Sequence, residues 1–202
     1  MGHIIVIAIA VMGFIIYMKG KRNTESPTEA FWERENEANS VRRKPLDNLD
    51  YITIPIDSLP MLKNTTDELL LEDQEKIISL SQKTIVNLTG ISNTDLKLEY
   101  GAPNLTILTE YDQNFILLAR TLNSWGHRLY ELGMIEEAKT VLEFGISCKT
   151  DVRTHYILLA NIYKEEFHPE KIDSLIETAD SLNSLMRNPI ITALQEIRER
   201  LS

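Results

Sequence analysis

Large apolar side chains recur with helical spacing along one stretch near the middle of the chain. The intervals alternate between three and four residues through Leu108, Tyr111, Phe115, Leu118, Leu122, Trp125, Leu129 and Leu132. This spacing places all eight side chains on one face of a continuous helix. A coiled coil would use the same pattern, but Gly133 ends the run and a second amphipathic stretch follows at once. We therefore expect the helix to pair with its neighbour in the same domain.

Weaker patterns surround this helix. Residues 67–88 have a helical stripe that begins at a Thr66 or Asp67 cap and ends before Gly90. Residues 91–104 contain Gly and Pro and are expected to form a connection. Residues 45–60 alternate like a strand but contain two prolines, which favours an extended segment that partly buries Ile52, Ile54 and Ile56. The alternative for this segment is a binding motif.

A short helix is expected from Pro27 to about Val41. Ser26 can cap it, Pro27 suits the first helical position, and Glu29 can complete the cap. Its aromatic side chains, Phe31 and Trp32, would contact either the membrane interface or the folded domain. The basic run over residues 42–44 that follows would contact lipid headgroups or solvent.

The second half of the chain repeats itself after 34 residues. When the sequence is shifted by 34 residues, side chains of similar size and polarity coincide at Leu122 and Tyr156, Trp125 and Leu159, Gly126 and Ala160, Leu129 and Tyr163, Leu142 and Ile176, and Gly145 and Ala179. A 34-residue period with two helices per unit resembles the tetratricopeptide repeats. Residues 119–152 resemble one repeat and residues 153–186 a second. The first unit has Gly126, Gly133 and Ala138 at the spacings of the family's small residues.

The second unit departs from the family pattern. Phe167 stands where the turn glycine is expected, and Ile172 replaces the small residue of the following helix. Pro169 opens that helix instead. A last amphipathic helix over residues 188–201 would cover the end of the stack. The expected fold is all-α, with a helical domain over residues 64–202 and a juxtamembrane helix and extended linker over residues 19–63.

The first residues of the chain differ in character from the rest. Residues 3–18 contain no Lys, Arg, Asp or Glu, and Lys19, Lys21 and Arg22 follow directly. A cleaved signal peptide would carry its basic residues before the apolar run, and Val6 stands where myristoylation requires Ser or Thr. The run therefore predicts a single-pass anchor in the cell membrane. The basic residues after it predict a cytoplasmic C-terminal domain. Asn-x-Thr triplets at Asn64, Asn87 and Asn104 are attributed to chance.

Charge and cysteine content exclude other classes of protein. The formal net charge is −9, and residues 45–202 contain 14 basic and 25 acidic side chains. Such a domain repels nucleic-acid phosphates. The single cysteine, Cys148, excludes an intramolecular disulfide. We find no catalytic constellation, no metal-ligand spacing among the four histidines and no phosphate-binding glycine loop, so neither an enzyme nor a cofactor is expected.

Recognition of another protein is the function that these patterns leave. In tetratricopeptide stacks, the first helix of each pair lines a concave binding face. The resemblance implies that a protein or peptide partner would contact Arg120, Asn123, His127, Tyr130, Asn161 and Lys164, with Glu131 and Thr154 beside them. Ordinary solvated helix surface is the alternative for these residues. For the whole chain we expect a membrane-anchored scaffold or adaptor; the alternatives are a self-associating structural module and, third, an enzyme with an unrecognised site.

Overall fold

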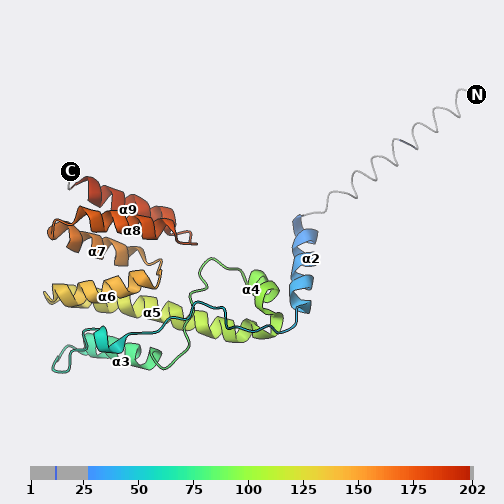
Figure 1. Ribbon diagram of the computed structural model, residues 1–202, viewed down its shortest axis with the longest axis horizontal. Helices are drawn as coiled ribbons and strands as arrows, with labels where there is room; N and C mark the ends of the chain where they lie inside the picture. Colours follow the sequence, from blue (N-terminus) through green and yellow to red (C-terminus); the bar gives the residue numbers. More distant parts are fainter. Residues whose placement is uncertain (1–11, 13–26, 201–202) are drawn as a thin grey trace, which may run out of the picture.

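The structure, a computed structural model, describes Met12 and residues 27–200 (Figure 1). In these residues, helices are the only regular elements. The expected all-α class is confirmed for these residues. The α-helices are α2 (Pro27–Ser40), α3 (Glu68–Leu80), α4 (Asn93–Tyr100), α5 (Leu105–Glu131), α6 (Ile135–Ser147), α7 (Arg153–Glu165), α8 (Pro169–Asp180) and α9 (Arg187–Glu199). Two 3₁₀ turns, η1 (Ile56–Ser58) and η2 (Ala102–Asn104), complete the set.

Helix α5 is the longest helix of the described chain, and it contributes residues to both hydrophobic cores of the molecule. Its predicted apolar stripe is buried from Leu108 to Leu129, while Tyr111 is half-buried. Leu132 was expected to continue the stripe, but it follows the end of α5 and is 42% exposed. The helix stops there because Gly133 adopts a left-handed backbone with φ of +75°, which a glycine accepts without strain.

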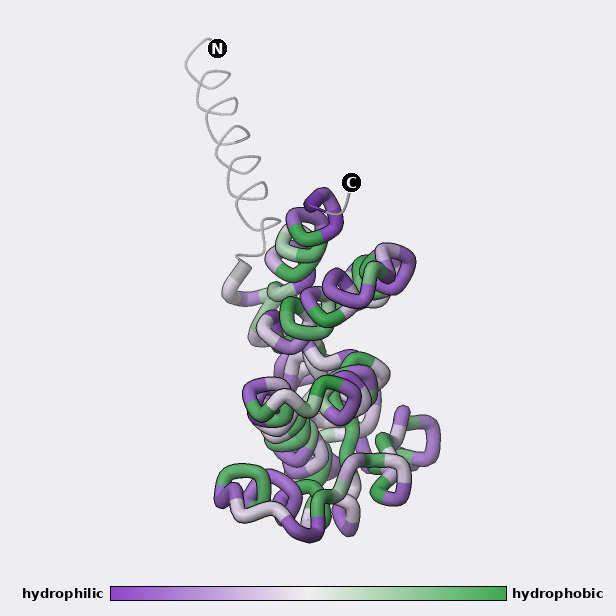
Figure 2. The backbone as a smooth tube through the Cα atoms, turned by 90° about the vertical axis from the view of Figure 1, so that its left-hand side faces the viewer, coloured by the Kyte–Doolittle hydropathy of each residue, from purple (hydrophilic) through white to green (hydrophobic). Residues whose placement is uncertain are grey.

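Helices α6 to α9 build a stack on the second half of α5. Helix α6 packs on α5 and α7, and α9 packs on both α7 and α8, while α3 covers another side of α5 (Figure 1). In Figure 2, hydrophobic and hydrophilic positions alternate along these helices, as expected where each helix buries one stripe. One continuous core follows, and it extends from Ile54 to Ile197.

A smaller core surrounds the first half of α5. It comprises Leu49, Val86, Leu88, Leu96 and Leu108. These residues come from the extended segment, the loop after α3, α4 and α5. The expectation that residues 45–60 form an extended segment is confirmed, apart from a turn at residues 47–49 and the 3₁₀ turn η1. Ile54 is buried, and Ile52 and Ile56 are half-buried against the main core.

The prediction of one helix over residues 67–88 is wrong at its C-terminal end. Helix α3 starts at the Asp67 cap, whose carboxylate accepts a hydrogen bond from Leu70 N at 3.0 Å, but it ends at Leu80. Beyond it, β-branched Ile85 and Val86 lie extended beside Tyr51 and Ile52, and Ile52 N donates to Ile85 O at 2.9 Å. The apolar positions after Leu80 are buried by this pairing rather than by a helix.

The expected connection over residues 91–104 contains a helix that the Gly and Pro residues concealed. Ser92 caps α4 by accepting a hydrogen bond from Asp95 N, and Leu96 is buried. Gly101 ends α4 with φ of +92°, and a Cβ atom there would lie 2.1 Å from Arg42 O. This close approach brings the chain after α2 against the end of α4.

Within the described residues, none of the helices combines the length and the apolar character that crossing a membrane would require. The predicted anchor over residues 3–18 lies outside the described part except for Met12. The Ser26 cap of α2 also lies outside it. Helix α2 itself ends at Ser40, close to the expected boundary.

Candidate functional site

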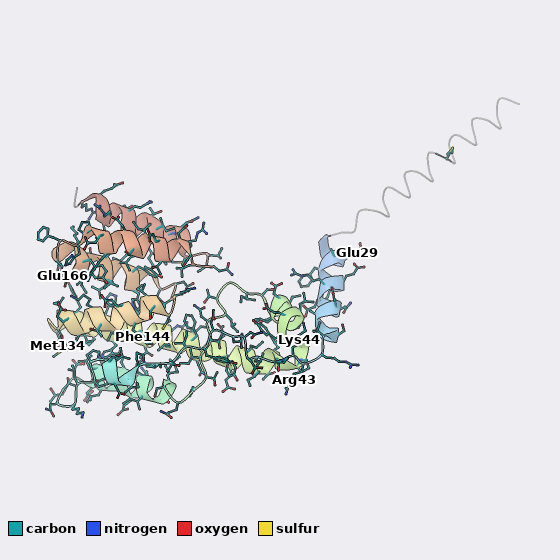
Figure 3. All side chains as sticks on the ribbon, viewed as in Figure 1. Glu29, Arg43, Lys44, Met134, Phe144 and Glu166 are labelled. Carbon is teal, nitrogen blue, oxygen red and sulfur yellow. The ribbon has the colours of Figure 1, made fainter. Side chains whose placement is uncertain are left out.

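Two helix pairs follow one another at the 34-residue interval. The second half of α5 and α6 form the first pair, and α7 and α8 form the second. Matched side chains are buried in both pairs: Leu122 and Tyr156, Trp125 and Leu159, and Leu129 and Tyr163. The turn between helices is also matched, because Phe167 adopts φ of +60° at the position equivalent to Gly133. Figure 3 shows Met134 and Glu166, which mark the two turns, at the same end of the stack.

Small residues set how closely the helices of the stack approach. A Cβ atom on Gly126 would lie 2.6 Å from Leu142 Cδ2 in the partner helix. Gly145 on α6 has the imidazole of His155 on α7 against it, and a Cβ atom there would lie 2.0 Å from His155 Cε1. The glycine at residue 145 therefore makes the space into which a fully buried histidine fits.

The first helices of the two pairs, α5 and α7, are joined by polar contacts on one shared face. Thr154 Oγ1 donates a hydrogen bond to Asn123 Oδ1 at 2.9 Å. Tyr130 OH donates to Glu165 Oε1 at 3.4 Å, and burial raises the pKa of this phenol. We name this surface the α5–α7 face. Its members are the six residues singled out from the sequence (Arg120, Asn123, His127, Tyr130, Asn161 and Lys164) together with Thr154, Ile157 and Glu165.

The structure places the six sequence-predicted residues on this face with different surroundings. Arg120 is exposed, and Lys164 and Asn161 are half-buried. None of these three has a side-chain partner among the described residues. His127 is half-buried, and its Nε2 atom is enclosed without a hydrogen-bond partner. Arg120 lies one helical turn from Asn123, and Asn161 and Lys164 lie two and three turns from Thr154 on α7. The face therefore offers two cations and an amide to a ligand.

Glu131, which was predicted to lie beside the face, already has a partner. Glu131 is exposed and accepts from Arg128 Nη1 at 2.9 Å, so this carboxylate balances a cation beside the face. Arg128 Nε also donates to Asp67 Oδ2 at 3.0 Å, which ties α5 to the start of α3. The hydrogen bonds from Arg128 and Leu70 hold the pKa of the Asp67 carboxyl below its ordinary value.

Sequence reasoning missed the contacts of Glu165 and Glu166. Adjacent glutamates on a helix suggest solvated surface, yet both reach back to the first helix pair. Glu165 accepts from Tyr130, and Glu166 forms an ion pair with Lys139 at 2.6 Å. This ion pair holds the pKa of Glu166 below its ordinary value. The only available signal was the 34-residue interval, which places Glu165 opposite Glu131 and Glu166 opposite Leu132.

Apolar side chains lie beside the polar groups of the face. Ile157 on α7 is half-buried, and Ile116 on α5, one turn before Arg120, is 41% exposed. Both belong to the same three-and-four spacing as the polar members of the face. A bound peptide would therefore find apolar surface as well as cations and amides.

A cleft lies away from this face. It has a volume of about 400 Å³ and is bounded by the loop after α3, the α6–α7 turn and the α8–α9 turn. Asn87 crosses it and donates to Cys148 O and Lys149 O at 3.2 and 3.0 Å. Burial raises the pKa of the Cys148 thiol to about 11, so the thiol is protonated at neutral pH and is a poor nucleophile.

Among the described residues, no group of three or more His, Cys, Asp or Glu side chains is arranged to hold a metal ion. Comparison of the chain with models of known protein families, with curated proteins and with solved structures found no match.

Proposed function

We propose that this protein is a membrane-tethered scaffold that binds a protein or peptide partner on its α5–α7 face in the cytoplasm. Helices α5 to α8 are assigned as two tetratricopeptide-like repeats, with α9 as the end of the stack and α3 covering its start. The observation that carries the proposal is the 34-residue correspondence between two consecutive helix pairs, which brings the first helix of each pair onto one surface.

The chemistry of the α5–α7 face supports recognition of a peptide. In a strongly acidic domain, Arg120 and Lys164 have no partner among the described side chains, and Asn161 adds a free amide. Such groups suit the carboxylates and backbone amides of an extended peptide. The Thr154–Asn123 and Tyr130–Glu165 hydrogen bonds join the two helices across the face.

The orientation of the domain is supported by the sequence around the proposed anchor. Basic residues follow the apolar run directly, which favours the cytoplasmic side. Two of the three Asn-x-Thr triplets also suit an unmodified protein. Asn104 Nδ2 donates to Lys44 O and Tyr100 O at 2.8 Å, and Asn87 is held by the end of α6. A glycan on either nitrogen would break these contacts.

Self-association has less support from the structure than from the sequence. Most of the apolar stripe that suggested it is buried within one chain, namely Leu108, Phe115, Leu118, Leu122, Trp125 and Leu129. Catalysis lacks a specific observation in its favour, since the thiol in the cleft is a poor nucleophile. Recognition of a protein or peptide partner is therefore the only function that we propose.

Affinity capture of the tagged full-length chain from a detergent extract tests the proposal. Wild type is compared with the double variant Arg120→Ala/Asn161→Ala, which removes one cation and one amide from the face. We expect recovery of co-purifying protein to fall roughly tenfold, equivalent to about 1.4 kcal/mol. Undiminished recovery with the double variant would contradict the assignment of the α5–α7 face.

A matched control separates this effect from a general change in charge. Lys83→Ala/Asn48→Ala removes the same two kinds of group from exposed positions away from the face. Its recovery of partner should equal that of the wild type. Equal losses in both double variants would point to non-specific electrostatic capture instead of a binding face.

A further inference from the structure

The first turns of α2 carry two exposed aromatic side chains. Phe31 is 54% exposed and Trp32 is 58% exposed, and their rings meet edge to face with centroids 5.4 Å apart. The alternative that these residues pack onto the folded domain is therefore wrong. Adjacent exposed aromatic residues are unfavourable in water and are typical of surfaces that meet another apolar phase.

The rings are exposed because α4 covers only the later turns of α2. Ala38 is fully buried at this contact, and Glu35 accepts hydrogen bonds from Thr94 and Lys97. Phe31 lies one turn before Glu35 on the same side of the helix. Figure 1 shows the first turns of α2 extending past α4.

Helix α2 is firmly attached to the domain at this contact. Lys97 Nζ also donates to Asn39 Oδ1 at 2.8 Å, and Arg34 forms an ion pair with Asp95. The chain after α2 continues the attachment, since Ala102 N donates to Val41 O at 3.1 Å. Any surface that holds the aromatic pair would therefore also fix the position of the domain.

The aromatic pair follows the proposed anchor closely in the sequence. Eight residues, 19–26, separate the apolar run from α2, and at full extension they span at most about 28 Å. The apolar run itself is 16 residues long. As a helix it would span about 24 Å, short of the roughly 30 Å of bilayer hydrocarbon. A span shorter than the hydrocarbon is accommodated by local thinning of the bilayer and by snorkelling of flanking residues, which keeps the following segment near the headgroups.

We propose that Phe31 and Trp32 insert into the headgroup region of the membrane and hold the helical domain in a fixed pose at the bilayer surface. Trp is favoured at this depth because its ring is apolar and its N–H group stays hydrogen-bonded. This inference rests on the proposed membrane anchor, and it adds a second contact with the same membrane.

The charges near the pair identify the kind of lipid surface. Glu33 and Glu37 on α2 are exposed acidic side chains. Arg43 and Lys44, labelled in Figure 3, donate to the carbonyl oxygens of Pro103 and Leu98 at 3.4 and 2.9 Å. The basic run is thus partly engaged by the protein itself. The contact is therefore apolar in origin and suits a zwitterionic surface.

Quenching of tryptophan fluorescence by brominated lipid tests the inference on the full-length chain. The protein is reconstituted into phosphatidylcholine vesicles with and without bromine on the acyl chains near the headgroups. Trp32 emission is the difference between the wild type and Trp32→Phe. The other tryptophan, Trp125, is fully buried in the stack and cancels in this difference. We expect brominated lipid to reduce the Trp32 signal roughly twofold.

A control tryptophan is placed at the far end of the stack. In the double variant Trp32→Phe/Phe167→Trp, the new side chain occupies a position that is 80% exposed in the turn between α7 and α8. Its emission should be insensitive to brominated lipid. Equal quenching of Trp32 and the control tryptophan would overturn the inference, as would a Trp32 signal that brominated lipid leaves unchanged.

Flotation of the same vesicles reports on the anchor separately. Flotation without Trp32 quenching leaves the anchor intact and overturns only the aromatic contact. Loss of flotation overturns the anchor and the inference together. A blue shift of Trp32 that grows with the protein-to-lipid ratio, without quenching, would assign the pair to contact with a second copy and overturn the membrane contact.

Discussion

Phe167 combines two unfavourable features in a single residue. It adopts φ of +60°, a conformation that suits glycine, and its ring is 80% exposed. The equivalent residue of the first helix pair, Gly133, adopts φ of +75°, and open space surrounds the position that a Cβ atom would take there. The turn therefore keeps its left-handed geometry because the packing of α7 on α8 requires it, even where the side chain opposes it.

Exchanging the side chains at these two turns should change stability in opposite directions. Phe167→Gly relieves the backbone strain, and we expect it to raise the free energy of unfolding by about 1 kcal/mol. Gly133→Ala meets no neighbouring atom but places a Cβ atom in the left-handed region, so it should cost about 1 kcal/mol. Urea titration of the full chain in mild detergent measures both. A destabilised Phe167→Gly variant would show instead that the phenyl ring contributes a stabilising contact.

His155 makes stability depend on pH in the mildly acidic range. It is fully buried, its Nε2–H donates to Leu142 O at 2.8 Å, and its Nδ1 has no partner. Burial disfavours the imidazolium and lowers the pKa to about 4 from the ordinary 6.5, although the Leu142 hydrogen bond opposes this shift. The unfolded chain therefore binds the proton first as the pH falls.

Stability from this histidine should be complete above pH 6.5 and decline as the pH falls toward about 4. The total loss amounts to roughly 3 kcal/mol. Urea midpoints of the wild type and His155→Gln, compared from pH 7.5 to 4.5, isolate this contribution because the carboxylates titrate in both proteins. If the midpoints of the two proteins changed in parallel with pH, the buried neutral imidazole of His155 would not be the source of the pH dependence.

At the scale of elements, Asp67 shows how one side chain can serve two contacts. It caps α3 through Leu70 N and pairs with Arg128 on α5. Asp67→Asn keeps an oxygen acceptor for the cap and weakens the ion pair, whereas Asp67→Ala removes both. We therefore expect the urea midpoint to fall in the order wild type, Asp67→Asn, Asp67→Ala. Equal midpoints for the two variants would mean that the cap contributes nothing measurable.

The elements that could be predicted from the sequence are those whose burial is local. The spacing over residues 108–129 specified α5, and the Pro169 and Gly133 signals marked turns correctly. The end of α3 could not be predicted, because Ile85 and Leu88 fit the helical stripe as well as Ile85 and Val86 fit an extended pairing. Their partner is the extended segment at Tyr51 and Ile52, more than 30 residues earlier. Only the tertiary pairing decides between the two structures.

The α5–α7 face was predictable for a similar reason. Asn123, His127 and Tyr130 lie on one side of α5 by helical spacing alone, and the 34-residue interval placed Thr154 and Asn161 on α7. The partners of these residues were not predictable. Tyr130 reaches Glu165, one position beyond the residue that the interval pairs with it. A contact between two helices depends on their crossing geometry, which the spacing does not contain.

At the scale of the whole molecule, the main core is continuous from the extended segment to α9. Residues as distant as Ile54 and Ile197 belong to one cluster of buried side chains. Helix α9 contacts α7 and α8, and each inner helix is covered on both sides by its neighbours. Two helix pairs alone would leave open apolar ends, so α3 and α9 complete the burial at either end of the stack.

A conservative change in the last helix should therefore destabilise the entire stack. Ile190 is fully buried on α9, and Ile190→Val should cost about 1 kcal/mol. The test follows urea unfolding by helical circular dichroism and by Trp125 fluorescence. A Trp32→Phe background ensures that the emission comes from α5 alone. If the stack unfolds as one unit, both midpoints fall by the same amount although Trp125 lies in another layer. A shift in circular dichroism alone would show that α9 unfolds separately, and a binding face on α5 and α7 would then persist without the end of the stack.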